Sequence, residues 1–219
     1  MKTEGQEDAG VINVYTKNVN PDKVYPVMVW IHGGGYQLGS GKGDLTGPDF
    51  LLQKDVIVVS FNYRLAAFGF LSMDDPELNI PGNAGLKDQT FALKWIQKNI
   101  ANFGGDPDNV TIFGGSAGGG SVHSHMISNY SKGLFHKAIP MSGVSFNKCW
   151  SLVPRRNWAE KLAMKLGYNG VGTEKDILEF LENAEALAIV NACGVLLTDE
   201  VKTISISLLS LVTVLSILF

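Results

Sequence analysis

A serine placed between small residues is the first feature of this chain that could do chemistry. Ser116 lies in segment 114–118 (GGSAG), directly after the apolar run 110–113. This is the layout of a nucleophile elbow, in which a strand ends in a turn so sharp that only small residues fit beside the serine. In a chain with 25 glycines this pattern alone is a weak signal, so it needs support from elsewhere.

A run of glycines earlier in the chain gives that support. His32 is followed by Gly33, Gly34 and Gly35, directly after the strand-like run 27–31. Consecutive glycines leave backbone N–H groups that can point at a ligand with no Cβ in the way. Such a loop can stabilise the negative charge that a nucleophile creates when it attacks a carbonyl group. The two motifs together predict the core of an ester hydrolase.

Strands and helices that could position these motifs alternate along the chain. Short β-branched or aromatic runs bounded by turn residues predict strands. Near-continuous apolarity in the second, third and fourth runs predicts burial on both faces, as in a parallel sheet covered by helices. Apolar residues at helical spacing from Phe91 to Phe103 predict a helix that stops at Gly104, and 106–109 then predicts a turn into the elbow strand. The predicted strands are 11–16, 27–31, 56–61 and 110–113, with a weaker one at 138–143 because Pro140 cannot donate to a ladder.

The later part of the chain is predicted to be helical. Trp158, Leu162 and Leu166 recur at a spacing of four residues and end at Gly167. Thr173 with Asp176 resembles a capping box that opens a second helix. The alternation of strands and helices up to the elbow indicates an α/β fold.

Composition narrows the range of functions. The chain has 219 residues, of which 45% are hydrophobic and 18% charged, as expected of a packed globular domain. A net charge of −3 without a Lys/Arg cluster argues against nucleic acid as a partner. Cys149 and Cys193 fit no metal motif, so we expect two free, partly buried thiols and neither metal nor cofactor. Residues 1–8 are polar and acidic, and we therefore expect no secretory signal.

The end of the sequence differs in character from the rest. Residues 203–219 carry no charge, and as a helix they would span about 25 Å, which is marginal for a hydrocarbon core of about 30 Å. A non-native or truncated end is the favoured interpretation, with a membrane-contacting tail and a buried element as alternatives. We therefore predict a hydrolase domain over 1–191 and a divergent apolar tail over 192–219.

Several longer motifs carry a resemblance to a known family. Residues 7 to about 190 resemble the type-B carboxylesterase/lipase family, the α/β-hydrolases that include cholinesterases and insect esterases. This resemblance implies an α/β-hydrolase fold with an incomplete, mostly parallel sheet flanked by helices. Besides the elbow, the motifs are 28–35 (MVWIHGGG), 62–65 (NYRL), 68–71 (FGFL), 82–89 (GNAGLKDQ) and 102–107 (NFGGDP).

The resemblance also implies roles for individual residues. Ser116 would be the nucleophile that accepts the acyl group of a small carboxylic ester. The backbone N–H groups of Gly34, Gly35 and Ala117 would form the oxyanion hole. A buried ion pair of the family falls on Arg64 and Asp88, where its role would be structural.

The chain departs from the family pattern at two positions. Gly115 stands where the family usually has a glutamate before the serine, and Ala9 stands where a disulfide cysteine is usual. The family's catalytic acid and histidine lie well downstream, in sequence that this chain does not have. We expect none of the histidines present to serve as the base; they are His32, His123, His125 and His136.

Three functions remain open from the sequence. The chain could be the N-terminal catalytic part of a serine carboxylesterase, a catalytically silent ligand-binding or decoy relative, or an adhesion-type member that uses the fold as a binding surface. Ser116 beside an intact glycine loop argues against adhesion, because a binding surface needs neither.

Overall fold

The computed structural model describes residues 10–146 and 157–196. These residues form two compact units. One consists of residues 10–70 and 82–146, and the other of residues 71–81 and 157–196. All the predicted site residues lie in the first unit.

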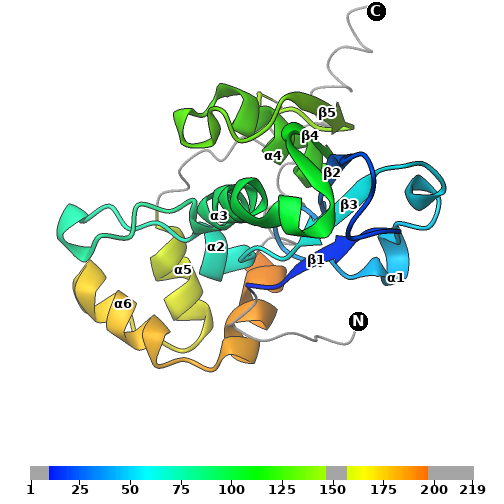
Figure 1. The fold of residues 1–219 in the computed structure, drawn as a ribbon. Coiled ribbons are helices and arrows are strands. Elements are labelled where there is room, and N and C mark those ends of the chain that lie inside the picture. Colours follow the sequence, from blue (N-terminus) through cyan, green and yellow to red (C-terminus); the bar gives the residue numbers. More distant parts are fainter. Residues whose placement is uncertain (1–9, 147–156, 197–219) are drawn as a thin grey trace, which may run out of the picture. The chain divides into compact units, whose positions relative to one another are not determined.

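The first unit is built on a five-stranded sheet with the strand order β1-β3-β2-β4-β5 (Figure 1). β1 runs antiparallel to β3, and the other neighbouring pairs are parallel. The predicted mostly parallel sheet is therefore confirmed, and the fifth strand forms at the edge despite Pro140. The strands are β1 (Ile12–Tyr15), β2 (Tyr25–Ile31), β3 (Ile57–Phe61), β4 (Gly105–Gly115) and β5 (Lys137–Met141).

Burial differs between the central strands. β3 is buried along its whole length, whereas β2 and β4 alternate between buried and half-buried residues. In β2, Val29 and Ile31 face the core while Trp30 is only half-buried. The expectation of burial on both faces is thus right for β3 and wrong for β2 and β4. An apolar run shows that a strand can be buried, but packing decides which of its faces is covered.

The helices of the first unit contribute to this core. α3 (Ala84–Asn99) continues as the 3-10 turn η3 (Ile100–Phe103) and ends at Gly104, whose φ is 80°, as the sequence predicted. Phe91 is 74% exposed, because the buried row of α3 runs through Leu93 and Ile96 instead. The remaining elements are α1 (Gly43–Thr46), η1 (Leu51–Gln53), α2 (Ala66–Phe70), α4 (Ala117–Ile127) and η4 (Asn129–Ser131).

The predicted turn at 106–109 lies within the bounds of β4. The Asp108 N–H donates to Asp106 Oδ1 at 2.9 Å, which closes a local turn. The register with β2 shifts at this point, since Tyr25 pairs with Gly105 and Val27 pairs with Val110. The turn is therefore present as an irregularity of the strand rather than as a separate loop.

The second unit is mainly helical. It contains η2 (Pro76–Leu78), α5 (Trp158–Lys165), α6 (Glu174–Glu182) and a helical stretch over 186–196. The predicted capping box is confirmed, because the Thr173 N–H donates to Asp176 Oδ2 at 2.6 Å and the Asp176 N–H to Thr173 Oγ1 at 3.4 Å. Cys193 is buried, whereas Cys149 and the apolar tail 203–219 lie outside the described residues. No helix within the described residues is long and apolar enough to cross a membrane.

Candidate active site

Ser116 lies between β4 and α4 in an unusual backbone conformation. Its φ is 58° and its ψ is −122°, a region that costs a residue other than glycine about 1–3 kcal/mol. The surrounding hydrogen bonds hold it there. The Ser116 N–H donates to Met141 O at 2.9 Å, and Ser116 O accepts from the Gly120 N–H at 2.9 Å. The turn therefore presents the side chain of Ser116 at the N-terminus of α4.

Glycines around Ser116 allow backbone segments to approach each other closely. A Cβ on Gly118 would overlap the carbonyl oxygen of Ile31, and one on Gly119 would lie 2.5 Å from Met141 O. The first turn of α4 therefore sits directly on the carboxyl ends of β2 and β5. Gly115 is different, because a Cβ there would meet only the Trp30 ring, at 3.7 Å.

The glycine loop passes beside the serine. A Cβ on Gly33 would lie 3.3 Å from the Cβ of Ser116. Gly34 and Gly35 have φ angles of 114° and 64°, which glycine adopts without strain. A Cβ on Gly35 would meet no heavy atom within 4 Å, so this part of the loop borders open space. The fold thus brings the loop to Ser116 and Ala117 at the carboxyl ends of β2 and β4.

Tyr36 fixes the far end of this loop. Its carbonyl oxygen accepts from the Ala66 N–H at 2.7 Å, and its ring lies 4.9 Å from that of Phe70. Tyr36 is buried although its φ is 61°, a left-handed conformation that is uncommon outside glycine. Contacts on several sides therefore determine where the loop ends.

The histidines have partners other than Ser116. His32 Nδ1 lies 2.9 Å from Gly33 O, and its ring stacks on Tyr63. His123 Nδ1 lies 2.7 Å from Ser145 Oγ, and His136 Nδ1 accepts from the Val110 N–H at 3.2 Å. Among residues 10–146 and 157–196, no histidine forms a hydrogen bond with Ser116.

A buried polar network beside the site was missed by the sequence analysis. It joins Tyr36 to residues of α3, α4 and η4. Its signal in the sequence is Gln89, which shares the buried row of α3 with Leu93 and Ile96. An amide on an otherwise apolar face must find polar partners inside the protein.

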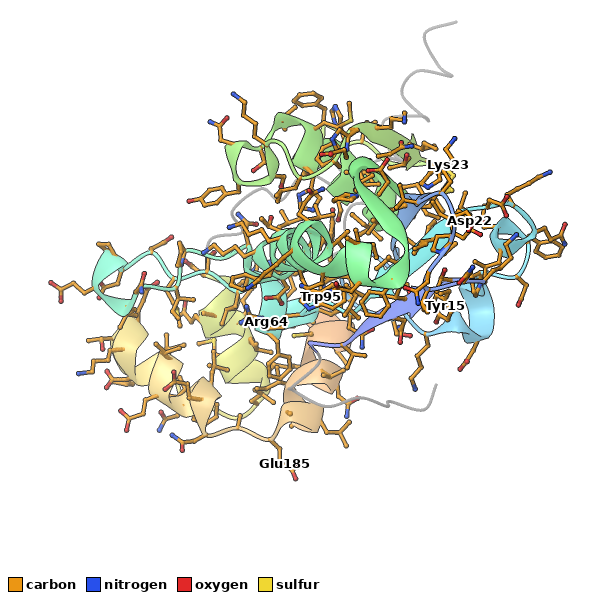
Figure 2. The ribbon with its side chains drawn as sticks, in the orientation of Figure 1. Tyr15, Asp22, Lys23, Arg64, Trp95 and Glu185 are labelled. Carbon is orange, nitrogen blue, oxygen red and sulfur yellow. The ribbon has the colours of Figure 1, made fainter. Side chains whose placement is uncertain are left out.

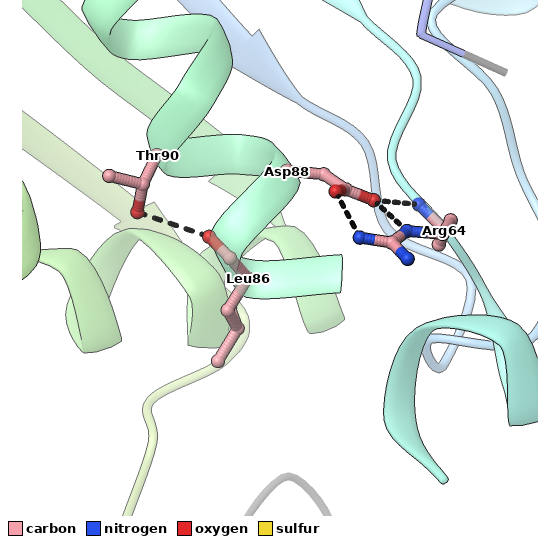
Figure 3. A network of polar contacts seen from close by, with 4 residues as sticks. All are labelled: Arg64, Leu86, Asp88 and Thr90. Carbon is pink, nitrogen blue, oxygen red and sulfur yellow. Dashed lines mark hydrogen bonds and ion pairs between the residues drawn. The ribbon is translucent and has the colours of Figure 1, made fainter. Parts of the chain in front are cut away.

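The predicted ion pair forms, but it is not buried. Arg64 Nη2 lies 2.7 Å from Asp88 Oδ1, and Asp88 Oδ2 accepts from Arg64 Nε and from the Arg64 backbone N–H at 2.8 and 3.0 Å (Figure 3). The side chains are 47% and 27% exposed, so the expectation of a buried pair is wrong for the described structure. The bond to Asp88 raises the pKa of Arg64. Solvent screens a pair of this exposure, and its contribution to stability is about 1 kcal/mol or less.

A surface cavity of about 410 Å³ adjoins the ion pair. Arg64 and Trp95, both labelled in Figure 2, line it together with Phe61 and Phe91. Neither Ser116 nor the glycine loop belongs to its wall. The described part of the chain contains no group of three or more His, Cys, Asp or Glu side chains that could hold a metal ion.

Comparison with known proteins agrees with this architecture. A model of the carboxylesterase family matches residues 1–212. The chain belongs to the carboxylesterase family. It is 50% identical to Esterase B1 of Culex pipiens over 200 residues, which cover 91% of this chain and 37% of that protein. It is 48% identical to a juvenile hormone esterase of Tribolium castaneum over 192 residues, or 84% and 32% of the two chains.

Solved carboxylesterases share the fold. The crystal structure of juvenile hormone esterase from Manduca sexta, with OTFP covalently attached, has a TM-score of 0.78 and 38% sequence identity, covering 88% of this chain and 36% of that one. A PNB esterase structure has a TM-score of 0.71 at 39% identity, covering 86% and 37%. The α/β-hydrolase fold is thereby established. The chain spans about a third of the length of these relatives.

Proposed function

We propose that this carboxylesterase-family chain supplies the nucleophile and the oxyanion hole of a serine hydrolase acting on small carboxylic esters. One observation carries the proposal: Ser116 is held in a strained turn between β4 and α4 with the glycine loop directly beside it. A strained serine at the start of a helix is typical of a nucleophile elbow. The covalent attachment of OTFP to the Manduca sexta esterase supports covalent chemistry in the family.

The proposed reaction begins with attack of Ser116 Oγ on the ester carbonyl carbon. The carbonyl oxygen becomes negatively charged, and the N–H groups of Gly34, Gly35 and Ala117 would donate hydrogen bonds to it. Loss of one such donor typically lowers kcat by about 10²–10³-fold. The alcohol then leaves, and water releases the acyl group from Ser116.

The serine proton needs a base. In α/β-hydrolases this base is a histidine that follows the nucleophile and the acid in the chain. The described histidines bond to other groups, so we propose that the triad acid and histidine come from outside the described residues. Without its base the serine remains a weak nucleophile.

A fluorophosphonate probe tests the proposal on the purified 219-residue chain. We expect slow covalent labelling of the parent, because its serine has no histidine base among the described residues, and none of Ser116→Ala. Ser124→Ala is the matched control, because it removes a hydroxyl from the same helix that bonds only to Gly120 O. Labelling of Ser124→Ala should equal that of the parent.

The second candidate function is ligand binding without turnover. The absence of a histidine bonded to Ser116 among the described residues favours it. A chain shown to be folded by circular dichroism that stays unlabelled would contradict hydrolysis by this chain alone. Calorimetric binding of a small ester without release of its acid would then support the binding function.

A further inference from the structure

A chain of buried polar side chains leads away from the glycine loop. Ser121 Oγ lies 3.3 Å from Tyr36 OH, and Gln89 Nε2 lies 3.1 Å from Ser121 Oγ. Gln89 Oε1 lies 2.8 Å from His125 Nε2, and His125 Nδ1 lies 2.6 Å from Ser131 Oγ. Each of these residues is at most 5% exposed, and Gln89, Ser121 and Ser131 are fully buried. Such a network is almost entirely shielded from water, so each donor depends on its neighbour.

The orientation of the Gln89 amide sets the directions of the hydrogen bonds from Gln89 to Ser131. Gln89 donates its amide N–H to Ser121, which turns its carbonyl oxygen toward His125. That oxygen can only accept, so His125 Nε2 carries a proton and donates it. Burial lowers the pKa of His125 to about 4, so the ring is neutral at neutral pH and Nδ1 accepts from the Ser131 hydroxyl. Ser121 donates onward to Tyr36 OH.

The network ends at the residue that follows the oxyanion glycines. Tyr36 comes directly after Gly35 and has a left-handed backbone, with a φ of 61°. A residue with a side chain keeps such a conformation only where its surroundings determine it. The Ser121 hydroxyl bonds to the Tyr36 side chain from α4, the helix whose first residue is Ala117. The network thus links the two segments that would bind the oxyanion.

We propose that Gln89 and Ser121 are positioning residues. They act through Tyr36 to hold the glycine loop, with Gly34 and Gly35, in a fixed position beside Ser116 and Ala117. The catalytic part of this inference rests on the proposed function. Neither Gln89 nor Ser121 touches the reacting atoms. His125 serves as a neutral link in the network and not as the catalytic base, because both of its ring nitrogens have partners.

A purely structural network would behave differently when broken. It would lower the stability of the whole chain and leave the loop in place relative to α4. A positioning network would loosen the loop locally. Three amides report the position of the loop, because Gln37 and Leu38 donate to Gly34 O and Ala66 donates to Tyr36 O.

Hydrogen exchange of these amides in the 219-residue chain tests the inference. The variants are Tyr36→Phe, Ser121→Ala and the double variant. Each single variant removes one partner of the hydrogen bond between Ser121 Oγ and Tyr36 OH. Ser124→Ala is the control, since its hydroxyl lies one turn away on α4 and bonds within the helix. We expect exchange about fivefold faster in each single variant, the factor that one ordinary hydrogen bond corresponds to. The double variant should exchange no faster than Ser121→Ala alone, because Ser121→Ala already removes the bond to Tyr36 as well as the bond to Gln89.

The fluorophosphonate reaction gives a second readout. Where Ser116 is labelled, Tyr36→Phe should lower the maximal labelling rate about fivefold and leave the half-saturating probe concentration unchanged, since the oxyanion forms only during reaction. Unchanged exchange in Tyr36→Phe and Ser121→Ala, or equal acceleration in Ser124→Ala, would overturn the inference. Faster exchange in a chain that the probe never labels would uphold the positioning and contradict catalysis by this chain alone.

Discussion

His125 shows how burial changes a single residue. Its pKa of about 4 lies well below the ordinary value of 6.5, because desolvation disfavours the charged ring. Between these two pH values the unfolded chain binds more protons at this residue than the folded chain. His125 therefore contributes a decrease in the free energy of unfolding as the pH is lowered from about 6.5 to 4. A shift of this size corresponds to about 3 kcal/mol at the acid end.

The contribution of His125 can be isolated with His125→Gln, which cannot titrate. We expect the variant to be less stable at pH 7, where it loses the bonds to Gln89 and Ser131, and less sensitive to acid. Urea unfolding at pH 7 and pH 4.5 measures both effects. Burial also lowers the pKa of His32, but that effect is common to both proteins and cancels in their difference. Two stability curves that run parallel with pH would contradict the prediction.

At the scale of elements, the start of α4 depends on glycines, whose lack of a side chain lets the helix approach the sheet closely. A Cβ on Gly118 would collide with the carbonyl oxygen of Ile31, and because this is a backbone atom, β2 or α4 would have to shift. We expect Gly118→Ala to destabilise the chain by about 3 kcal/mol or more. Gly115→Ala is the matched control, because its Cβ would make an ordinary contact with Trp30 at 3.7 Å. It should stay within about 1 kcal/mol of the parent.

Urea unfolding, monitored by tryptophan fluorescence, compares the stability of the two alanine variants. Equal stability of Gly118→Ala and Gly115→Ala would show that α4 does not sit as closely on β2 as described. Gly115 is also the position at which the family resemblance leads us to expect a glutamate. The space beside Gly115 is compatible with a side chain there.

At the scale of the whole molecule, β5 leaves one edge of the sheet open. Within the described residues it pairs only with β4 (Figure 1). Its residues Ile139 and Met141 are 45% and 38% exposed. Val144 and Phe146, just beyond the strand, are also exposed. An open edge with apolar side chains favours pairing with other chains.

We therefore expect the 219-residue chain to self-associate as its concentration rises. Ile139→Lys should weaken this association, because a lysine on an edge strand opposes pairing. Val171→Lys is the control, since Val171 is 86% exposed in the other unit. Sedimentation velocity over a range of concentrations measures the effect. A monomeric parent, or equal weakening by both substitutions, would contradict the prediction.

The sequence predicts local features of this fold better than distant contacts. The turn at Ser116 and the end of α3 at Gly104 depend on neighbouring residues, so their patterns are visible in the chain. Burial of a face depends on what packs against it, which is why Phe91 and Trp30 are more exposed than their apolarity suggests. The contact of Gln89 with Ser121 joins residues 32 positions apart, and no short motif predicts it.

The backbone of Ser116 has a consequence for how this chain changes over generations. Glycine adopts positive φ angles far more readily than serine, and a single base change converts some serine codons into glycine codons. A lineage that no longer used the hydroxyl could relieve the turn by that one mutation and gain stability. In such a lineage stability would favour glycine at this position, so a serine kept in this strained turn indicates that its hydroxyl is still used.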